Sequence, residues 1–146
     1  MSDHALLGSW RLVTWESIAE DDGEVSRPMG ETPEGLLSYT AEGRMLVLIG
    51  RSDRPRSSDD DFFGGSTAER AAAAESFVAY GGRFEVAGDD VLHHVELSLF
   101  PNWVGSTQRR TMVFGADGDT LELTSPPFVL GSVLRTQRLR WSRIRG

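Results

Sequence analysis

The chain lacks cysteine and lysine altogether, although it is 146 residues long. Without cysteine it cannot form disulfides, thiolate nucleophiles or cysteine-based zinc and iron–sulfur sites. Every one of its 15 basic residues is an arginine, and with 22 acidic residues the net charge is −7. Nucleic acid is therefore not an expected partner, because neutralising phosphates needs a basic face. A chain of this length can bury a core as one domain, residues 1–146, without metal or disulfide staples.

The sequence also lacks an apolar run long enough to cross a membrane. The first residues, Met1 to His4, show no basic region followed by an apolar segment, as a secretory signal would. We therefore expect no membrane partner and a cytoplasmic location. The abundance of Arg, Ala, Gly and Asp, with a single Asn, is typical of a GC-rich bacterial genome.

Alternating segments rich in apolar, aromatic and β-branched residues predict strands along most of the chain. These segments are residues 8–16, 35–40, 44–50, 83–87, 90–100, 106–114, 120–125 and 133–144. Most connections between them are short, which is typical of an up-and-down meander. Closure would remove the two exposed edges of such a sheet. The expected fold class is therefore all-β, a closed up-and-down antiparallel β-barrel of about eight strands.

One segment predicts a helix, inserted between the third and fourth strands. Ser66 and Glu69 have the spacing of a capping box, the run Ala68 to Tyr80 has an apolar stripe at helical spacing, and Gly81-Gly82 would end the helix. The preceding segment, residues 51–65, is charged and aperiodic, and it includes an apolar pair, Phe62 and Phe63. We expect a mobile loop there, which could serve as a lid over the barrel or as a subunit interface.

Strand alternation predicts which side chains face the interior. His93 falls on the apolar face of its strand and His94 on the other, so the two cannot bind one metal ion together. The expected inward polar groups are Tyr39, His93, Gln108 and Arg110. A buried arginine is costly unless it is paired. Three alternatives stay open for Arg110: a ligand with an anionic or carbonyl oxygen, water, or an internal salt bridge with Glu16 or Glu122.

The first strand carries two tryptophans on opposite faces. Trp10 is expected inside, whereas Trp15 is expected outside, where it could form a contact in a homodimer. The acidic run Asp59-Asp60-Asp61 lies in the charged loop and is expected to be a solvated surface rather than a cation site. We expect no metal and no cofactor.

Gly8-Ser9-Trp10 resembles the Gly-x-Trp signature on the first strand of lipocalins, and Arg143 in Trp141-Ser142-Arg143 resembles the arginine that stacks on that tryptophan. The whole chain is similar to the bacterial and fungal lipocalin-like domain family. Further segments that carry the resemblance are residues 28–39, 80–86, 93–95, 100–105, 108–110 and 139–143. The resemblance implies a small calycin-type barrel with one end closed by Trp10 and Arg143. Related small barrels include cofactor-free cyclases and isomerases as well as binding proteins.

Our first functional prediction is a cofactor-independent cyclase or isomerase of secondary metabolism, acting on an apolar carbonyl-bearing substrate. Arg110 and Tyr39, aided by Gln108, would stabilise negative charge on the carbonyl oxygen, while His93 would shuttle a proton. The alternatives are a non-catalytic carrier for an apolar or anionic small ligand, and an interaction module whose own side chains fill the barrel. The mouth should lie near Trp103 and residues 51–65. The expected ligand-binding residues are Met45, Phe100, Trp103, Gln108, Met112, Phe114 and Trp141.

Overall fold

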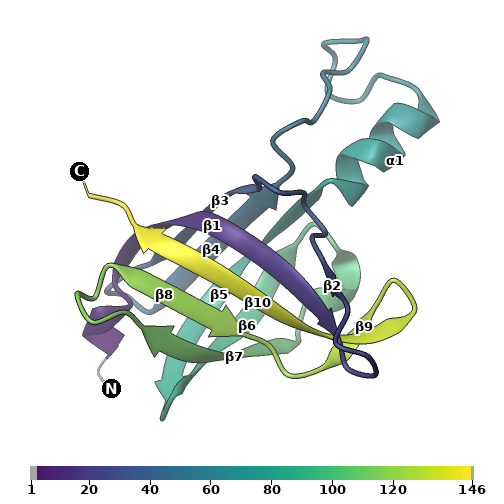
Figure 1. The fold of residues 1–146 in the computed structure, drawn as a ribbon. Helices are drawn as coiled ribbons and strands as arrows, with labels where there is room; N and C mark the ends of the chain where they lie inside the picture. The colour runs from purple at the N-terminus through teal and green to yellow at the C-terminus, as the bar shows by residue number, and fades with distance from the viewer. Residues whose placement is uncertain (1–2, 146) are drawn as a thin grey trace.

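A computed structural model describes residues 3–145 and shows one antiparallel sheet that closes on itself (Figure 1). The strand order is β2-β1-β3-β4-β5-β6-β7-β8-β10-β9, and pairing of β1 with β10 closes an eight-strand barrel. The predicted all-β barrel is therefore confirmed. The strands are β1 Gly8–Ala19, β2 Val25–Ser26, β3 Glu34–Tyr39, β4 Arg44–Gly50, β5 Phe77–Ala87, β6 Asp90–Ser98, β7 Thr107–Phe114, β8 Thr120–Thr124, β9 Phe128–Leu130 and β10 Val133–Arg143. The 3-10 turns are η1 Asp3–Ala5 and η2 Pro101–Trp103.

The single helix, α1 (Thr67–Glu75), projects away from the barrel and contributes no buried residue (Figure 1). Its capping box is as predicted: the Ser66 hydroxyl accepts from the backbone N–H of Glu69, whose carboxylate accepts from that of Ser66. The helix lies between β4 and β5 and not between the third and fourth strands, because the short β2 was not anticipated. The strand before it, β4, is the segment 44–50 that was predicted as the third strand.

The predicted extension of the helix to Tyr80 is wrong. The helix stops at Glu75, and β5 begins at Phe77. Residues 77–80 are largely aromatic or β-branched, and they pair with β4, for example Val78 with Ile49 and Tyr80 with Val47. Pairing with a distant strand thus overrides the local helical pattern. Gly81 and Gly82 are not a helix stop either, since both lie inside β5.

Gly82 is required by a close approach of two strands. The register between β5 and β6 shifts between Gly81 and Gly82, which is a β-bulge. A Cβ atom on Gly82 would lie 1.9 Å from the carbonyl oxygen of His94. Only glycine fits at this crossing, so Gly82 is explained by strand packing.

A second irregularity changes which side chains of β1 point into the barrel. The register between β1 and β10 shifts between Leu12 and Thr14. Before the shift the even-numbered Trp10 and Leu12 are buried, and after it the odd-numbered Trp15 and Ser17 are buried. The prediction that Trp15 lies outside is therefore wrong, because the extra residue moves its side chain to the interior.

One end of the barrel is shut by Trp10 and Arg143. The guanidinium carbon of Arg143 lies 4.2 Å from the centroid of the Trp10 ring. Arg143 also donates to the carbonyl oxygens of Ala5 at 2.6 Å and Leu7 at 2.8 Å. The N-terminal turn is thereby held across this end, which leaves the opposite end as the opening. Within residues 3–145, no helix has the length and apolar character needed to cross a membrane.

Candidate ligand-binding site

The barrel encloses a cavity of about 290 Å³. Its wall is mostly apolar, with Leu37, Val47, Ile49, Leu123 and Leu139 contributed by four strands. Because this space is not filled by side chains, the structure argues against the interaction module with a solid barrel. The volume lies at the small end of the range for ligand pockets, so one small molecule fits.

A chain of three hydrogen-bonded side chains runs from the core to the cavity. The Tyr39 hydroxyl on β3 lies 2.7 Å from Nε2 of His93 on β6, and the Tyr80 hydroxyl on β5 lies 2.7 Å from Nδ1 of the same ring. Tyr39 and His93 are each 2% exposed. Tyr80 and His93 line the cavity, and Tyr39 lies behind them. Both ring nitrogens of His93 are thus occupied by tyrosine hydroxyls.

Burial shifts all three of these groups toward their neutral forms. Burial, with smaller contributions from the nearby Arg110 and His94, lowers the pKa of His93 to about 3. Burial also raises the pKa of Tyr39 and of Tyr80, and Arg110 partly offsets this rise. At neutral pH the chain therefore consists of an uncharged imidazole between two uncharged phenols.

Arg110 lines the same cavity from β7 and is half-buried. Its guanidinium donates to the carbonyl oxygen of Arg109 at 2.8 Å and to Oε1 of Gln108 at 3.4 Å. Within residues 3–145 it forms no ion pair. The predicted alternative of a salt bridge with Glu16 or Glu122 is wrong, because Glu16 pairs with Arg138 and Arg27, and Glu122 pairs with Arg140.

Further donors line the side of the cavity formed by β1 and β10. Trp15 donates its indole N–H to Oε1 of Gln137 at 2.8 Å. The Gln137 amide nitrogen and the Trp141 indole nitrogen are buried and have no hydrogen-bond partner among the residues that the structure describes. Gln137 and Trp141 both line the cavity. The polar groups on this side are therefore donors in need of acceptors.

The structure brings only part of the predicted site to the cavity. His93, Arg110, Trp103 and Trp141 line it. The other predicted residues do not line the cavity. Tyr39, Met45 and Met112 are buried in the core, Gln108 and Phe114 are half-buried, and Phe100 is half-exposed. Phe100 packs edge-on against Trp103, with ring centroids 5.5 Å apart.

Sequence reasoning missed Trp15, Tyr80 and Gln137. Nothing in the sequence around Trp15 signals the bulge that turns it inward. Tyr80 was assigned to the helix. Gln137 was detectable, because strict alternation in β10 places it on the face of Trp141.

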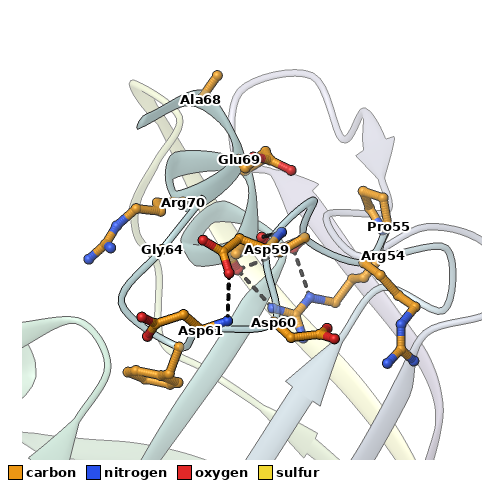
Figure 2. A pocket seen from close by; sticks show the side chains of 15 residues that line it. Arg54, Pro55, Asp59, Asp60, Asp61, Gly64, Ala68, Glu69 and Arg70 are labelled. Carbon is orange, nitrogen blue, oxygen red and sulfur yellow. Dashed lines mark hydrogen bonds between the residues drawn. The ribbon is translucent and has the colours of Figure 1, made fainter. Parts of the chain in front are cut away.

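A larger hollow, about 800 Å³, lies outside the barrel between residues 54–64 and α1 (Figure 2). Most of the charged side chains that line it bond to other residues of the loop or of α1. Glu69 accepts from Ser58 and Ser66, and Arg70 donates to the carbonyl oxygen of Phe63. The loop is therefore an open surface segment whose polar groups largely bond to one another and to α1, and we do not place the ligand site there.

The acidic run in this loop is likewise engaged in turns. Asp59 accepts from the backbone N–H of Asp61 at 2.9 Å (Figure 2). Asp61 in turn accepts from the backbone N–H of Phe63 at 3.0 Å. In residues 3–145, no group of three or more His, Asp or Glu side chains is arranged to hold a metal ion.

Comparison with known proteins agrees with the geometry. A family model described as a lipocalin-like domain matches residues 7–144. The chain belongs to the lipocalin-like domain family. It is 34% identical to the 4'-hydroxy-3'-methoxypropiophenone carrier protein of Aspergillus oryzae, over 68% of this chain and 96% of that relative. The predicted family resemblance is thus confirmed, and the relative is a fungal member of the same kind.

Within this lipocalin-like barrel, the arrangement suits recognition of oxygen acceptors in an apolar setting. The polar wall consists of the Tyr80 hydroxyl, the Arg110 guanidinium and the two partnerless donors of β10. Among the described residues that line the cavity, the one carboxylate belongs to the exposed Glu75, at the end of α1. Few but well-placed polar groups in an apolar cavity are typical of a small-molecule site.

Proposed function

We propose that this protein is a non-catalytic carrier for a small, largely apolar molecule with oxygen acceptors, held in the barrel cavity. The observation that carries the proposal is Arg110, a half-buried cation that faces an apolar cavity without a carboxylate partner. A charge in such a setting is costly unless a partner compensates it. A ligand oxygen would compensate it.

The donors of β10, which is separated from β7 by β8 alone, support the same ligand chemistry. A buried donor without a partner costs about 1–3 kcal/mol. The Gln137 amide and the Trp141 indole are two such donors. A ligand with more than one acceptor group could bond to Arg110 and to these donors, while its apolar body would pack against Leu37, Val47 and Leu123.

The similarity to a carrier protein supports a ligand class. The compound in that relative's name is an aromatic ketone with one hydroxyl and one methoxy group. Its oxygens could accept hydrogen bonds from Arg110, Gln137 and Trp141, and its aromatic ring could pack against the apolar wall. We propose oxygenated aromatic ketones as the ligands of this chain.

The geometry favours a carrier over the predicted cyclase or isomerase. A proton shuttle needs a pKa near the working pH and a nitrogen that can reach the substrate. The pKa of His93 is held at about 3, and both of its nitrogens are bonded to tyrosines. Catalysis by His93, Arg110 and Tyr39 stays a prediction.

Binding can be tested with 4'-hydroxy-3'-methoxypropiophenone and the related carboxylate 4-hydroxy-3-methoxybenzoate. Trp15, Trp103 and Trp141 line the cavity, so quenching of tryptophan fluorescence reports occupancy. We expect saturable one-to-one binding of at least one probe. Lack of binding by both would overturn the proposal.

A matched pair of variants tests the location. Val47→Phe fills the cavity from β4, whereas Leu46→Phe places the same ring on the outer face, where Leu46 is 64% exposed. We expect Val47→Phe to lose affinity at least about tenfold, which equals about 1.4 kcal/mol of binding free energy, and Leu46→Phe to lose none. Equal binding by both variants would place the ligand elsewhere. Chromatography of recovered ligand should show no new product, and a new product would favour the isomerase.

A further inference from the structure

The hydrogen-bond chain through His93 has a direction that donor counting can assign. A neutral imidazole has one N–H donor and one acceptor nitrogen. One tyrosine must therefore donate to the ring, and the other must accept from it. The direction decides which tyrosine keeps a free hydroxyl hydrogen.

Tyr39 decides the direction. Its hydroxyl is buried, it does not line the cavity, and its one hydrogen bond within residues 3–145 is to Nε2 of His93. If Nε2 carried the proton, the Tyr39 hydroxyl hydrogen would have no acceptor in the core, which is unfavourable. Tyr39 therefore donates to Nε2, and the proton of His93 is on Nδ1.

The consequence appears at Tyr80. Nδ1–H of His93 donates to the Tyr80 oxygen, so the Tyr80 hydroxyl hydrogen is left to find an acceptor on the cavity side. Arg110 lines the same cavity, and its positive charge partly offsets the burial that raises the pKa of Tyr80. A directed hydroxyl and a guanidinium together favour an oxyanion over a neutral oxygen.

Among residues 3–145, no carboxylate forms an ion pair with Arg110 or a hydrogen bond with Tyr80. The titratable or charged residues around it are Tyr39, His93, Arg110 and the exposed Glu75, while His94 acts from the outer face. Strands β8 and β10 face the cavity with uncharged side chains, such as Leu123 and Gln137.

We propose that Tyr80 and Arg110 form an oxyanion site, and that the chain carries weakly acidic aromatic compounds, such as phenols conjugated to a ketone, as their anions. Tyr39 and His93 are positioning residues, which fix the Tyr80 hydroxyl as a donor without contacting the ligand oxygen. The inference rests on the proposed carrier function and adds the ionisation state of the ligand.

The first test needs no ligand. Nitrogen-15 NMR of the imidazole distinguishes a proton on Nδ1 from a proton on Nε2. We expect the Nδ1–H form for His93 in the wild-type protein at pH 7. Observation of the Nε2–H form would overturn the directed chain and leave the carrier function intact.

The second test follows the ionisation of a bound probe. The phenolate of 4'-hydroxy-3'-methoxypropiophenone absorbs at longer wavelength than the phenol, so a pH series on the saturated protein gives the ionisation midpoint of the bound probe. We expect this midpoint to lie about one pH unit or more below that of the free probe. A bound probe with an unshifted or raised midpoint would overturn the inference, whereas a probe that does not bind would overturn the carrier function as well.

Variants separate the ligand contacts from the positioning chain. Tyr80→Phe and Arg110→Gln should each remove most of the downward shift, and Tyr39→Phe should reduce it, because the His93 ring can then adopt either tautomer. Arg109→Gln is the matched control, since Arg109 pairs with Asp90 on the outer face and should leave the shift unchanged. The methylated probe 3',4'-dimethoxypropiophenone cannot ionise, so Tyr80→Phe should bind it at most about threefold more weakly than the wild-type protein does. A shift retained in Tyr80→Phe and Arg110→Gln would contradict the proposal.

Discussion

The indole N–H of Trp15 donates to Oε1 of Gln137, 2.8 Å away, and links β1 to β10 in the wall of the barrel cavity. The two residues are separated by 122 positions in the sequence, and both side chains are buried. This hydrogen bond depends on the bulge in β1, which turns Trp15 inward. A buried donor and a buried acceptor are thereby satisfied together.

Gln137→Leu should lower the free energy of unfolding by about 1–3 kcal/mol, because the Trp15 indole hydrogen then lacks an acceptor in the core. Urea denaturation would measure the change through its midpoint. The double variant Trp15→Phe with Gln137→Leu removes both partners, so its loss should be smaller than the sum of the two single losses. Strict additivity would show that the bond contributes nothing. Thr136→Val, on the outer face of the same strand, should change stability by less than about 1 kcal/mol.

Strand alternation predicted the inward-facing residues only where the strand pairing is regular. Strict alternation in β6 and β7 placed His93 and Arg110 toward the interior, because these strands carry no register shift where they pair with each other. The alternation rule failed for Trp15, because one extra residue after Leu12 reverses every later position. Nothing in the residue types at that point marks the bulge, since strand formers continue through it.

Tyr80 shows a different limit. The alanine-rich run before it has helical periodicity, and the competing information lies in β4, far away in the sequence. The partner strand decides the conformation of residues 77–80, so a local pattern could not find the residue that completes the His93 chain. The cavity's polar groups were thus only partly predictable, although the barrel itself was.

Gly82→Ala should be strongly destabilising, with a loss of about 3 kcal/mol or more, because the new Cβ would collide with the backbone carbonyl of His94. Thermal unfolding followed by circular dichroism would measure it. Gly81→Ala is the matched neighbour: its nearest contact is the Cδ2 atom of Leu46, a flexible side chain that is largely exposed. We expect a clearly smaller loss there. Equal losses would mean that the bulge is not the cause.

Arg143→Ala should cost about 2–4 kcal/mol, because it removes the cation–π contact with Trp10 and the charged hydrogen bonds to Ala5 and Leu7. Arg143→Lys should recover less than half of the loss, since one ammonium group cannot replace the planar fork. Denaturant titration would measure both. Arg145→Ala, which removes an exposed ion pair, should change stability by at most about 1 kcal/mol. A loss in Arg145→Ala as large as in Arg143→Ala would contradict the role of the Trp10 contact.

Stability should fall as the pH drops below about 6.5, and His93 should be a main cause. Burial holds the pKa of His93 at about 3 in the folded chain, against 6.5 for an unperturbed histidine. Between these values the unfolded chain binds one more proton than the folded chain, so the free energy of unfolding decreases with decreasing pH, by up to about 1.4 kcal/mol per pH unit. Urea titrations at several pH values between 7 and 5 would measure this slope, because most carboxylates titrate below this range.

His93→Gln should flatten this slope, even though losing the bonds to Tyr39 and Tyr80 lowers stability at pH 7. His94→Gln is the control, because His94 lies on the outer face, where it bonds to Glu85 and Thr107. It should keep most of the slope. If His93→Gln keeps the wild-type slope and His94→Gln loses it, the buried imidazole takes up its proton without unfolding. The Tyr39–His93–Tyr80 chain would then not be locked in its neutral state, and the donor assignment to Tyr80 would lose its basis.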